Sequence, residues 1–398
     1  MAQSPAADLL LQPDVDFLRD LRERAGDSFL RCYQCGTCAA VCPFARESLE
    51  LPRREMLLAQ WGQKSLLLDD PNLWVCTTCG NCARLCPREV DIPGTIAALR
   101  EIAVLESAPP QELGKAFEHT LGRGNPLGEP ARARAGWTRE AGVEVPVMAQ
   151  VARPVDVLFY VECYWSYHPR GRAAAQAMAR TLAALGVDFA ILGQEERCIG
   201  DSQRLGGETG LFEELAQRNI EVLSRYDFRL LVTPDPHAFH ALRKHYPALG
   251  WQGEVMHYSQ FLEEQLPRLS LHPLPQVRVT YHDPCYLGRY SGIYDPPRQI
   301  LASIPGLSLI EMEHNRENSL CCGGGGGGVW NSGFTATQVS ERLSERRVRE
   351  AVAAGAEVLV VACPFEVSLF EDAIKATGNE GRLVVRDIVE LVDASLRA

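Results

Sequence analysis

The chain has 398 residues, a formal net charge of −11 and a hydrophobic content of 46%, which is enough for two or three domains with sizeable cores. Its acidity, and the lack of any dense run of Lys and Arg, argue against nucleic acid or an anionic membrane surface as the main partner. No secretory leader and no apolar run of membrane-spanning length is visible. We therefore expect a cytoplasmic protein that reaches a membrane face only through partner subunits.

The fourteen cysteines fall into two groups. Eight lie between Cys32 and Cys86, and the other six are spread from Cys163 to Cys363. Cysteines clustered in short motifs of a cytosolic chain indicate metal ligation rather than disulfides. The two groups predict two different kinds of site.

The first group forms two motifs, CYQCGTCAAVCP at residues 32–43 and CTTCGNCARLCP at residues 76–87. Both match the C-x2-C-x2-C-x3-C-P run, in which three thiolates hold one cluster and the fourth reaches the other cluster. The motifs predict two [4Fe-4S] cubane clusters, one held by Cys32, Cys35, Cys38 and Cys86 and the other by Cys76, Cys79, Cys82 and Cys42. Two zinc sites are the alternative, but a proline-terminated run that occurs twice favours iron–sulfur clusters.

Amphipathic patterns around residues 14–24, 53–61 and 93–105 predict a mostly helical domain over residues 1–106. The stretch between the two motifs is predicted to be a long helical insert that ends at Trp74. Together with the sequence CPREVDIPGTIAALR, this insert resembles the electron-transfer subunit of heterodisulfide reductases, which is a helical ferredoxin. The resemblance implies that the domain relays single electrons.

Residues 107–154 are rich in Pro, Gly, Arg and Ala, which predicts an extended linker with one short helix near Gln111 to Leu121. Beyond the linker, short β-rich runs alternate with helical patterns, as is typical of parallel α/β layers. The same order then recurs, so we predict an internal duplication with units at 155–274 and 275–398. The predicted fold class is α/β overall, with a helical two-cluster ferredoxin domain in front.

In the second unit, Cys285 ends a strand, Cys321 and Cys322 precede six glycines, and Cys363 follows another strand. Strand-end loops of a parallel sheet meet at its carboxyl edge, so the four thiolates are expected to converge there on a further cluster. Glycines such as Gly323 and Gly324 can offer backbone N–H donors to sulfide or substrate. A phosphate-binding loop is disfavoured, because neither G-x-x-x-x-G-K-[ST] nor a strand-borne G-x-G-x-x-G fits here.

The two units resemble the CCG-domain family. This family includes the iron–sulfur subunit of glycolate oxidase and the catalytic subunits of heterodisulfide reductases, one type of which fuses the ferredoxin and CCG parts as this chain does. The resemblance covers nearly the whole chain. It implies that Cys285, Cys321, Cys322 and Cys363 hold a non-cubane [4Fe-4S] cluster that cleaves disulfides. The fifth cysteine of the family pattern is Glu366 here, and this carboxylate can ligate iron, leave a position open for substrate, or be lost as a ligand.

The first unit departs further from the family pattern. Cys163 is kept, but Cys-Cys-Gly becomes Cys198-Ile199-Gly200, and the CxxC motif becomes residues 235–238, which read DPHA. With two thiols left, we expect a scaffold without a cluster, and a mixed site completed by Asp235 and His237 is the alternative.

One histidine of the second unit is a further candidate for the site. It is His282, and together with the next residue, Asp283, it lies close to Cys285; the two are either proton donors for reduction chemistry or a strand-end cap.

Three functions follow from these sites. The first is a catalytic oxidoreductase subunit of a multi-subunit complex, in which the ferredoxin clusters feed a C-terminal cluster that handles a disulfide, a thiol or another sulfur compound. The second is a conduit between a flavoprotein dehydrogenase of lactate, glycolate or electron-transfer-flavoprotein type and a quinone-linked, cytochrome-type membrane protein. The third is a docking role, with the C-terminal cysteines binding zinc or nothing.

Overall fold

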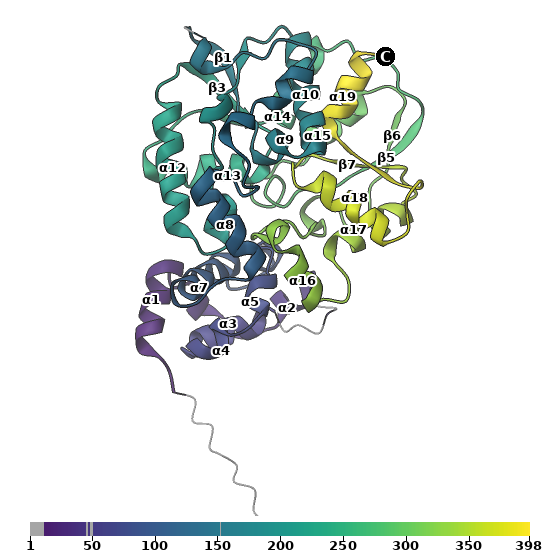
Figure 1. The fold of residues 1–398 in the computed structure, drawn as a ribbon. Helices are drawn as coiled ribbons and strands as arrows, with labels where there is room; N and C mark the ends of the chain where they lie inside the picture. The colour runs from purple at the N-terminus through teal and green to yellow at the C-terminus, as the bar shows by residue number, and fades with distance from the viewer. Residues whose placement is uncertain (1–11, 45–46, 48–50, 152) are drawn as a thin grey trace, which may run out of the picture.

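The computed structural model describes residues 12–44, 47, 51–151 and 153–398. A helical N-terminal region lies at the base of the molecule, and two α/β units stand above it (Figure 1). Among the described residues, no helix combines the length and the apolar character that crossing a membrane requires.

The N-terminal region is helical, as the sequence predicts, but the described residues between the two motifs form three short α-helices instead of one long helix. Gly62 follows the first of them with a φ of +61°, a conformation that favours glycine, and a Cβ at this position would also lie 3.0 Å from the Asp14 carbonyl oxygen. Pro71 precedes the third, and a proline disfavours helix in the residue before it. The helices are α1 (Val15–Ala25), α2 (Thr37–Val41), α3 (Arg53–Gln60), α4 (Lys64–Leu68), α5 (Asn72–Val75), α6 (Asn81–Arg84) and α7 (Ile92–Glu106).

The connector is packed rather than extended. Helix α8 (Gln111–Arg123) lies where the sequence predicts a short helix. Short 3₁₀ helices follow at Ala131–Ala133, Gly136–Glu140 and Met148–Gln150. Trp137, with 1% of its surface exposed, belongs to a hydrophobic core that contains residues of both units. The expectation of an extended linker did not anticipate this burial.

Each α/β unit contains a parallel four-stranded sheet, and the two sheets have equivalent strand orders, β2-β1-β3-β4 and β6-β5-β7-β8. The duplication and the parallel α/β fold predicted from the sequence are therefore confirmed. The strands are β1 (Val155–Phe159), β2 (Phe189–Ala190), β3 (Phe228–Thr233), β4 (Val255–His257), β5 (Val277–Tyr281), β6 (Leu307–Leu309), β7 (Val358–Val361) and β8 (Val384–Asp387).

Helices cover the sheets and join them. Those of the first unit are α9 (Cys163–Tyr167), α10 (Pro169–Ala184), α11 (Asp201–Leu205), α12 (Thr209–Leu223), α13 (Pro236–Lys244) and α14 (Tyr258–Gln265). Those of the second unit are α15 (Asp295–Ser303), α16 (Ser332–Gln338), α17 (Leu343–Ala353), α18 (Glu366–Ala376) and α19 (Ile388–Leu396).

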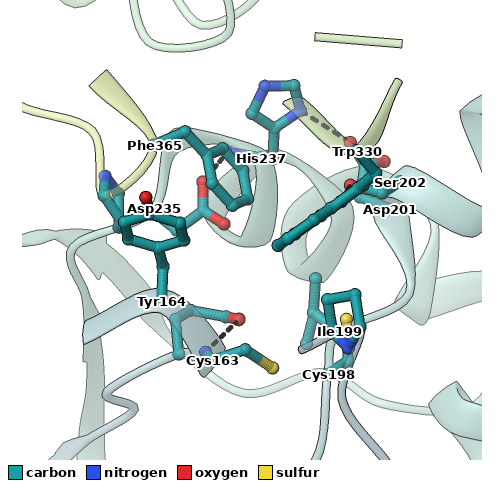
Figure 2. Close-up of a pocket in the computed structure, with 13 residues that line it drawn as sticks. Cys163, Tyr164, Cys198, Ile199, Asp201, Ser202, Asp235, His237, Trp330 and Phe365 are labelled. Atoms are coloured by element: carbon teal, nitrogen blue, oxygen red, sulfur yellow. Dashed lines mark hydrogen bonds and ion pairs between the residues drawn. The ribbon is translucent and has the colours of Figure 1, made fainter. Parts of the chain in front are cut away.

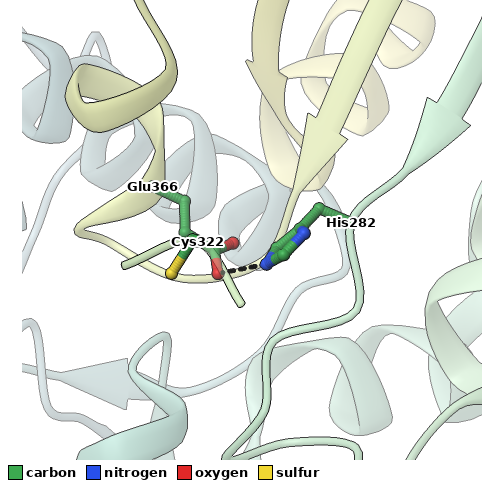
Figure 3. A group of neighbouring side chains, drawn as sticks. All are labelled: His282, Cys322 and Glu366. Carbon is green, nitrogen blue, oxygen red and sulfur yellow. Dashed lines mark ion pairs between the residues drawn. The ribbon is translucent and has the colours of Figure 1, made fainter. Parts of the chain in front are cut away.

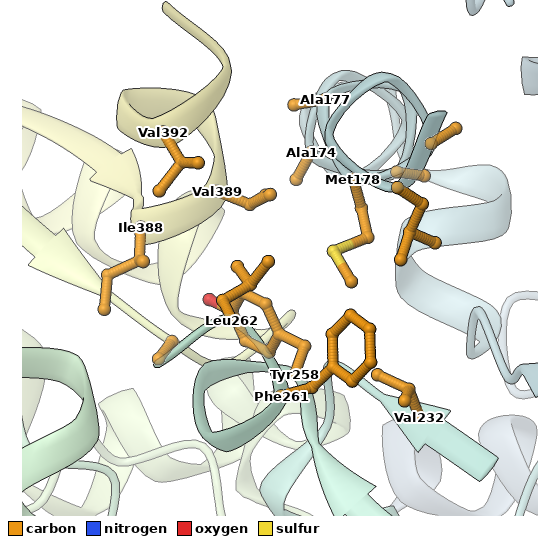
Figure 4. Packing of buried hydrophobic residues seen from close by; sticks show 14 of the residues in the cluster. Ala174, Ala177, Met178, Val232, Tyr258, Phe261, Leu262, Ile388, Val389 and Val392 are labelled. Atoms are coloured by element: carbon orange, nitrogen blue, oxygen red, sulfur yellow. The ribbon is translucent and has the colours of Figure 1, made fainter. Parts of the chain in front are cut away.

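The two units share one hydrophobic core. Helix α10 packs against α19, and α14 packs against α15. Figure 4 shows Met178 of α10, Phe261 of α14 and Val389 of α19 directed into the same space, and all three are buried in one cluster. Across this interface the Tyr258 hydroxyl donates to Asp387 Oδ1 at 2.7 Å. Because burial of apolar surface is the main stabilising contribution, the pair of units is expected to fold as one body.

Arg100 of α7 ties the N-terminal region to both units. Its buried guanidinium donates to the carbonyl oxygens of Leu73 and Cys76 at 2.9 and 2.6 Å within the N-terminal region. It also donates to Leu205 of the first unit at 3.0 Å and to Gly326 of the second unit at 2.9 Å. The Arg100 side chain therefore connects both units to the second cysteine motif.

Candidate metal centres

The first centre is a hollow of about 360 Å³ at the surface of the N-terminal region. The four cysteines predicted to hold one cluster, Cys32, Cys35, Cys38 and Cys86, all line it. Gly36 takes the left-handed conformation, with a φ of +85°, and starts α2, so the loop turns tightly around the hollow. The Gln34 side-chain amide donates to Cys32 Sγ at 3.4 Å.

The second centre is a hollow of the same size that lies deeper in the molecule. It is lined by the other predicted set, Cys42, Cys76, Cys79 and Cys82. Asn81 of the second motif donates to the Val41 carbonyl oxygen of the first at 3.0 Å and so holds the two loops together. The Thr78 backbone N–H donates to Cys76 Sγ at 3.4 Å.

The donor sets of these two hollows suit iron–sulfur clusters. Burial raises the pKa of Cys38 to about 11 and that of Cys42 to about 12, so these groups need positive charge close by to become thiolates. Iron ions supply that charge. Four sulfur atoms around one cavity, with backbone N–H groups aimed at sulfur, are the surroundings that a cubane requires.

The third centre gathers thiols of the second unit. Cys285 and Cys322 lie within hydrogen-bonding reach of Cys321, and hydrogen bonds from Cys285, Cys322 and Cys79 lower the pKa of Cys321. The Gly323 N–H donates to Cys321 Sγ at 3.3 Å, and the Gly324 N–H donates to Cys322 Sγ at 3.5 Å. The two glycines singled out in the sequence therefore direct their backbone donors at sulfur.

Glu366 and His282 complete this centre. Their ligand atoms and Cys322 Sγ all lie within 4.8 Å of one another, and the three side chains converge from the end of β5, the loop that carries Cys322 and the start of α18 (Figure 3). His282 Nε2 is 3.2 Å from Glu366 Oε1. In the described part of the chain, His282 Nε2 and Glu366 Oε2 find no hydrogen-bond partner although both are buried. A buried sulfur and a buried carboxylate that lie this close together, beside an imidazole, fit a metal.

The protonation of the His282 ring indicates different roles for His282 and Glu366. Arg347 Nε donates to His282 Nδ1 at 3.0 Å, and a guanidinium is always protonated, so Nδ1 carries no proton. Burial lowers the pKa of His282, which keeps the ring neutral with its proton on Nε2, facing Glu366. His282 is thus arranged to orient the carboxylate, and Glu366 is the group arranged to reach a metal.

Cys363 and Asp283 are the other polar candidates of the second unit. Cys363 is buried directly after β7, and burial, followed by the negative charge of Glu366, raises its pKa. Asp283 accepts two hydrogen bonds from Arg298 at 2.7 and 2.9 Å and one from the Arg316 N–H at 2.7 Å. Asp283 is therefore a structural residue, as the strand-end interpretation predicts.

The second and third centres touch each other. The thiols of Cys79 and Cys321 lie within hydrogen-bonding reach, and Cys321 Sγ is 3.3 Å from Thr77 Oγ1. The glycine run makes this approach possible, because a Cβ at Gly325 would lie 2.5 Å from the Thr77 carbonyl oxygen. The sequence did not predict this contact or the contacts of Arg100 and Arg347. The spacing of residues within a motif does not show which distant loops contact each other.

The first unit places Cys163 and Cys198 at the equivalent edge of its own sheet, around a hollow of about 370 Å³. Asp235 and His237 line the same hollow, but they are engaged elsewhere. His237 Nδ1 lies 2.8 Å from Asp201 Oδ2, and Asp235 accepts from the His237 backbone N–H at 2.8 Å. Figure 2 shows the His237 ring turned toward Asp201 and away from the two cysteines. Two of the four side chains of the mixed site considered from the sequence are thus engaged in other contacts.

Comparison with known proteins agrees with this arrangement. Residues 28–90 match the 4Fe-4S dicluster domain, and residues 157–243 and 279–365 each match the cysteine-rich CCG domain. The chain is 30% identical to one of the subunits of the dihydromethanophenazine:CoB–CoM heterodisulfide reductase of Methanosarcina barkeri, over 92% of this chain and 93% of that polypeptide. The chain belongs to the CCG-domain iron–sulfur oxidoreductases. Its clusters are [4Fe-4S] clusters and include a non-cubane one, as predicted.

Other CCG-domain relatives are longer than this chain. The probable iron–sulfur-binding oxidoreductase FadF of Bacillus subtilis is 36% identical over 83% of this chain and 47% of its own length. The EtfAB:quinone oxidoreductase of Syntrophomonas wolfei is 32% identical over 83% of this chain and 48% of its own length. The chain thus spans about half of either protein.

Among solved structures, a hypothetical protein from Helicobacter pylori matches with a TM-score of 0.57 at 12% identity, over 97% of this chain and 73% of that one. At this identity the match bears on the fold alone. It supports the arrangement of a helical domain and two α/β units in one chain.

Proposed function

We propose that this CCG-domain protein is the subunit of a redox complex in which two ferredoxin-type centres and a third, non-cubane centre act on a disulfide, a thiol or a related sulfur compound. One observation supports the proposal most strongly. The Cys321 thiol lies next to those of Cys79 and Cys322, and Cys322 in turn lies next to the buried pair Glu366 and His282. A substrate centre needs both an electron supply and an incomplete thiolate set, and these residues supply both features.

The ligands follow from the three centres. Cys32, Cys35, Cys38 and Cys86 would hold one cubane, Cys42, Cys76, Cys79 and Cys82 the other, and Cys285, Cys321, Cys322 and Cys363 the non-cubane cluster. When bound, these clusters accept and release single electrons. Arg100, whose guanidinium donates to the Cys76 carbonyl oxygen at 2.6 Å, places a fixed positive charge beside the second centre and favours its reduced, more negative state.

Glu366 distinguishes the third centre from the two cubanes. Its carboxylate stands where the family pattern has a fifth cysteine and contacts the Cys322 thiol. A carboxylate is a harder and weaker ligand for iron than a thiolate, so a substrate sulfur can displace it. His282 keeps it oriented through the 3.2 Å approach of Nε2, and Arg347 fixes His282 in turn.

Substrate access is supported by the hollow between the two units. That hollow is lined by Pro364 and Phe365, the two residues that follow Cys363, together with Trp330 of the second unit. A small sulfur compound in the hollow would thus stand next to the loop that carries Cys363 and Glu366. All four candidate thiols of the third centre are buried, so contact with bulk solvent is restricted.

The proposal can be tested by following the EPR spectrum of the anaerobically oxidised protein as small thiols are added. We expect a thiol-dependent signal from the third centre that is lost in Cys322→Ser. The signals of the reduced cubanes should be kept in the same variant, which shows that it is folded. A spectrum that does not respond to thiols would contradict sulfur chemistry at this site.

A second candidate function is an electron conduit between a flavoprotein dehydrogenase of electron-transfer-flavoprotein, lactate or glycolate type and a quinone-linked membrane protein. The relatives favour it, because one of them is named an EtfAB:quinone oxidoreductase. The burial of every thiol of the third centre also suits a relay. An unresponsive EPR spectrum, combined with rapid reduction of all clusters by a reduced flavoprotein, is the result that this function predicts.

A further inference from the structure

The first unit contains a pair of thiols that the iron–sulfur centres do not use. Cys163 and Cys198 are both buried, and both line the hollow of about 370 Å³ at the carboxyl edge of the first sheet. Their thiols lie within hydrogen-bonding reach of each other. Figure 2 shows the two side chains side by side at the base of the hollow.

The surroundings of this pair stabilise one thiolate. Arg134 Nη2 donates to Cys163 Sγ at 3.2 Å, and Glu196 Oε1 holds the same guanidinium at 2.7 Å. Although burial acts to raise it, the pKa of Cys163 is lowered, because the Cys198 thiol and the Arg134 guanidinium favour the charged form. The contact with Cys163, followed by burial, raises the pKa of Cys198. The pair thus consists of a nucleophilic sulfur and a neighbouring thiol.

A buried carboxyl group adjoins the pair. Glu162 lines the hollow, has a strained φ of +69°, and accepts from the Cys163 N–H through Oε2 at 3.3 Å. Its other oxygen, Oε1, is buried and makes no hydrogen bond to a described residue. Burial raises the pKa of Glu162 well above its usual value, so this carboxyl holds a proton that it can give to a leaving thiolate before it takes one from Cys198.

We propose that Cys163 and Cys198 are a reversible two-electron dithiol/disulfide couple that exchanges with small disulfides and thiols entering the hollow. The Cys163 thiolate attacks one sulfur of a disulfide R–S–S–R′, a Cys163–S–S–R bond forms, and the leaving R′–S⁻ group takes the proton of the Glu162 carboxyl. The Glu162 carboxylate then takes the proton of Cys198, the Cys198 thiolate attacks Cys163 Sγ, and the leaving R–S⁻ group receives that proton from Glu162 and is released as R–SH. In balance, the dithiol and one external disulfide give the protein disulfide and two thiols. This couple is additional to the iron–sulfur centres.

The test uses the full-length protein, equilibrated without oxygen in buffers of reduced and oxidised dithiothreitol. Samples are quenched in acid, alkylated with N-ethylmaleimide and digested with trypsin. The two cysteines fall in tryptic peptides 140–170 and 198–204, each of which contains no other cysteine. We expect a linked pair of these peptides that forms and disappears reversibly with the dithiothreitol ratio. Two alkylated, unlinked peptides at every ratio would overturn the proposal.

Two further measurements separate this couple from a metal site and from a structural pair. Cys163→Ser and Cys198→Ser should each abolish the linked peptide and leave the iron content of the protein unchanged. Loss of iron in either variant would make the pair a metal site and refute the couple. Arg134→Gln should slow N-ethylmaleimide labelling of Cys163 in the reduced protein about tenfold near pH 7, and Arg139→Gln, in the same connector, should not.

Discussion

The two α/β units have the same fold and different chemistry. Their sheets share one strand order, and β4 and β8 each lead into a helix whose first turn is closed by a capping box, at His257 and at Asp387. At the carboxyl edge, the second unit keeps Cys285, Cys321 and Cys322 in contact, whereas the first keeps two thiols. The sheets and the shared core thus maintain the same fold in both units. The residues of the loops at the carboxyl edge determine what each unit can bind.

The most direct way to break this comparison is to remove one thiol from each unit. Cys322→Ser is expected to lose the third cluster, about four irons per chain, because it removes a sulfur from the group that includes Glu366. Cys198→Ser, which removes the thiol of the equivalent loop in the first unit, is expected to keep all the iron. Colorimetric iron analysis of the two variants after anaerobic purification checks the prediction. Equal losses of iron in both variants would mean that the two units do not differ in cluster binding.

A second substitution tests the residue that takes the place of a cysteine. Glu366→Gln should keep the iron of the third centre but change its EPR spectrum, since an amide oxygen is a poorer ligand than a carboxylate. The matched control is Glu371→Gln on the same helix, where the carboxylate pairs with Arg170 at 2.7 Å near the surface. If both variants give the wild-type spectrum, Glu366 does not contact the cluster.

A third pair of substitutions concerns the glycine run that only the second unit has. Gly325→Ala would place a Cβ 2.5 Å from the Thr77 carbonyl oxygen and is expected to cost about 1–3 kcal/mol. It should also weaken magnetic coupling between the second and third centres. Gly210→Ala in α12 of the first unit meets open space and should stabilise the protein by up to about 1 kcal/mol. Urea denaturation measures both, and a neutral Gly325→Ala would disprove the close approach.

The two capping residues predict opposite pH dependences. Burial raises the pKa of Asp387 to about 7 and lowers the pKa of His257 to about 3. The folded state keeps a proton on Asp387 that the unfolded chain releases above about pH 4, so this residue makes the protein less stable as pH rises to about 7. His257 acts in the other direction, because below about pH 6.5 the unfolded chain takes up a proton that the folded state refuses.

Single substitutions should separate these two effects. From about pH 5 to about pH 7, Asp387→Asn should gain about 2–3 kcal/mol of stability relative to the wild type. His257→Asn should lose about 2 kcal/mol relative to the wild type over the same interval. Urea denaturation at the two pH values checks both signs, and a difference that does not change with pH would contradict the assignment.

What the sequence predicts well is local. The spacing of cysteines within each motif is enough to divide eight of them between two hollows, because the loop geometry depends on a few neighbouring residues. The register of the duplication likewise places Cys163 and Cys285 at equivalent strand ends. Even the donor role of Gly323 and Gly324 follows from their position after the two cysteines.

What the sequence misses depends on packing between distant segments. The contact of Cys79 with Cys321 needs the glycine run to lie on the second motif, which no spacing reports. The sequence also does not show whether a candidate ligand is engaged by another residue. His237 is an example, because its Nδ1 contacts Asp201. For the same reason, the connector around Trp137 looks like an extended linker although it contributes to the core.

The central claim is that the second unit, and not the first, holds a third cluster beside the two cubanes. Iron and acid-labile sulfide counts on the wild-type protein, purified without oxygen, test it most directly. We predict about twelve irons and about twelve sulfides per chain, the content of three [4Fe-4S] clusters. About eight would leave the second unit without its cluster, and about sixteen would give the first unit one as well; either result would contradict the account.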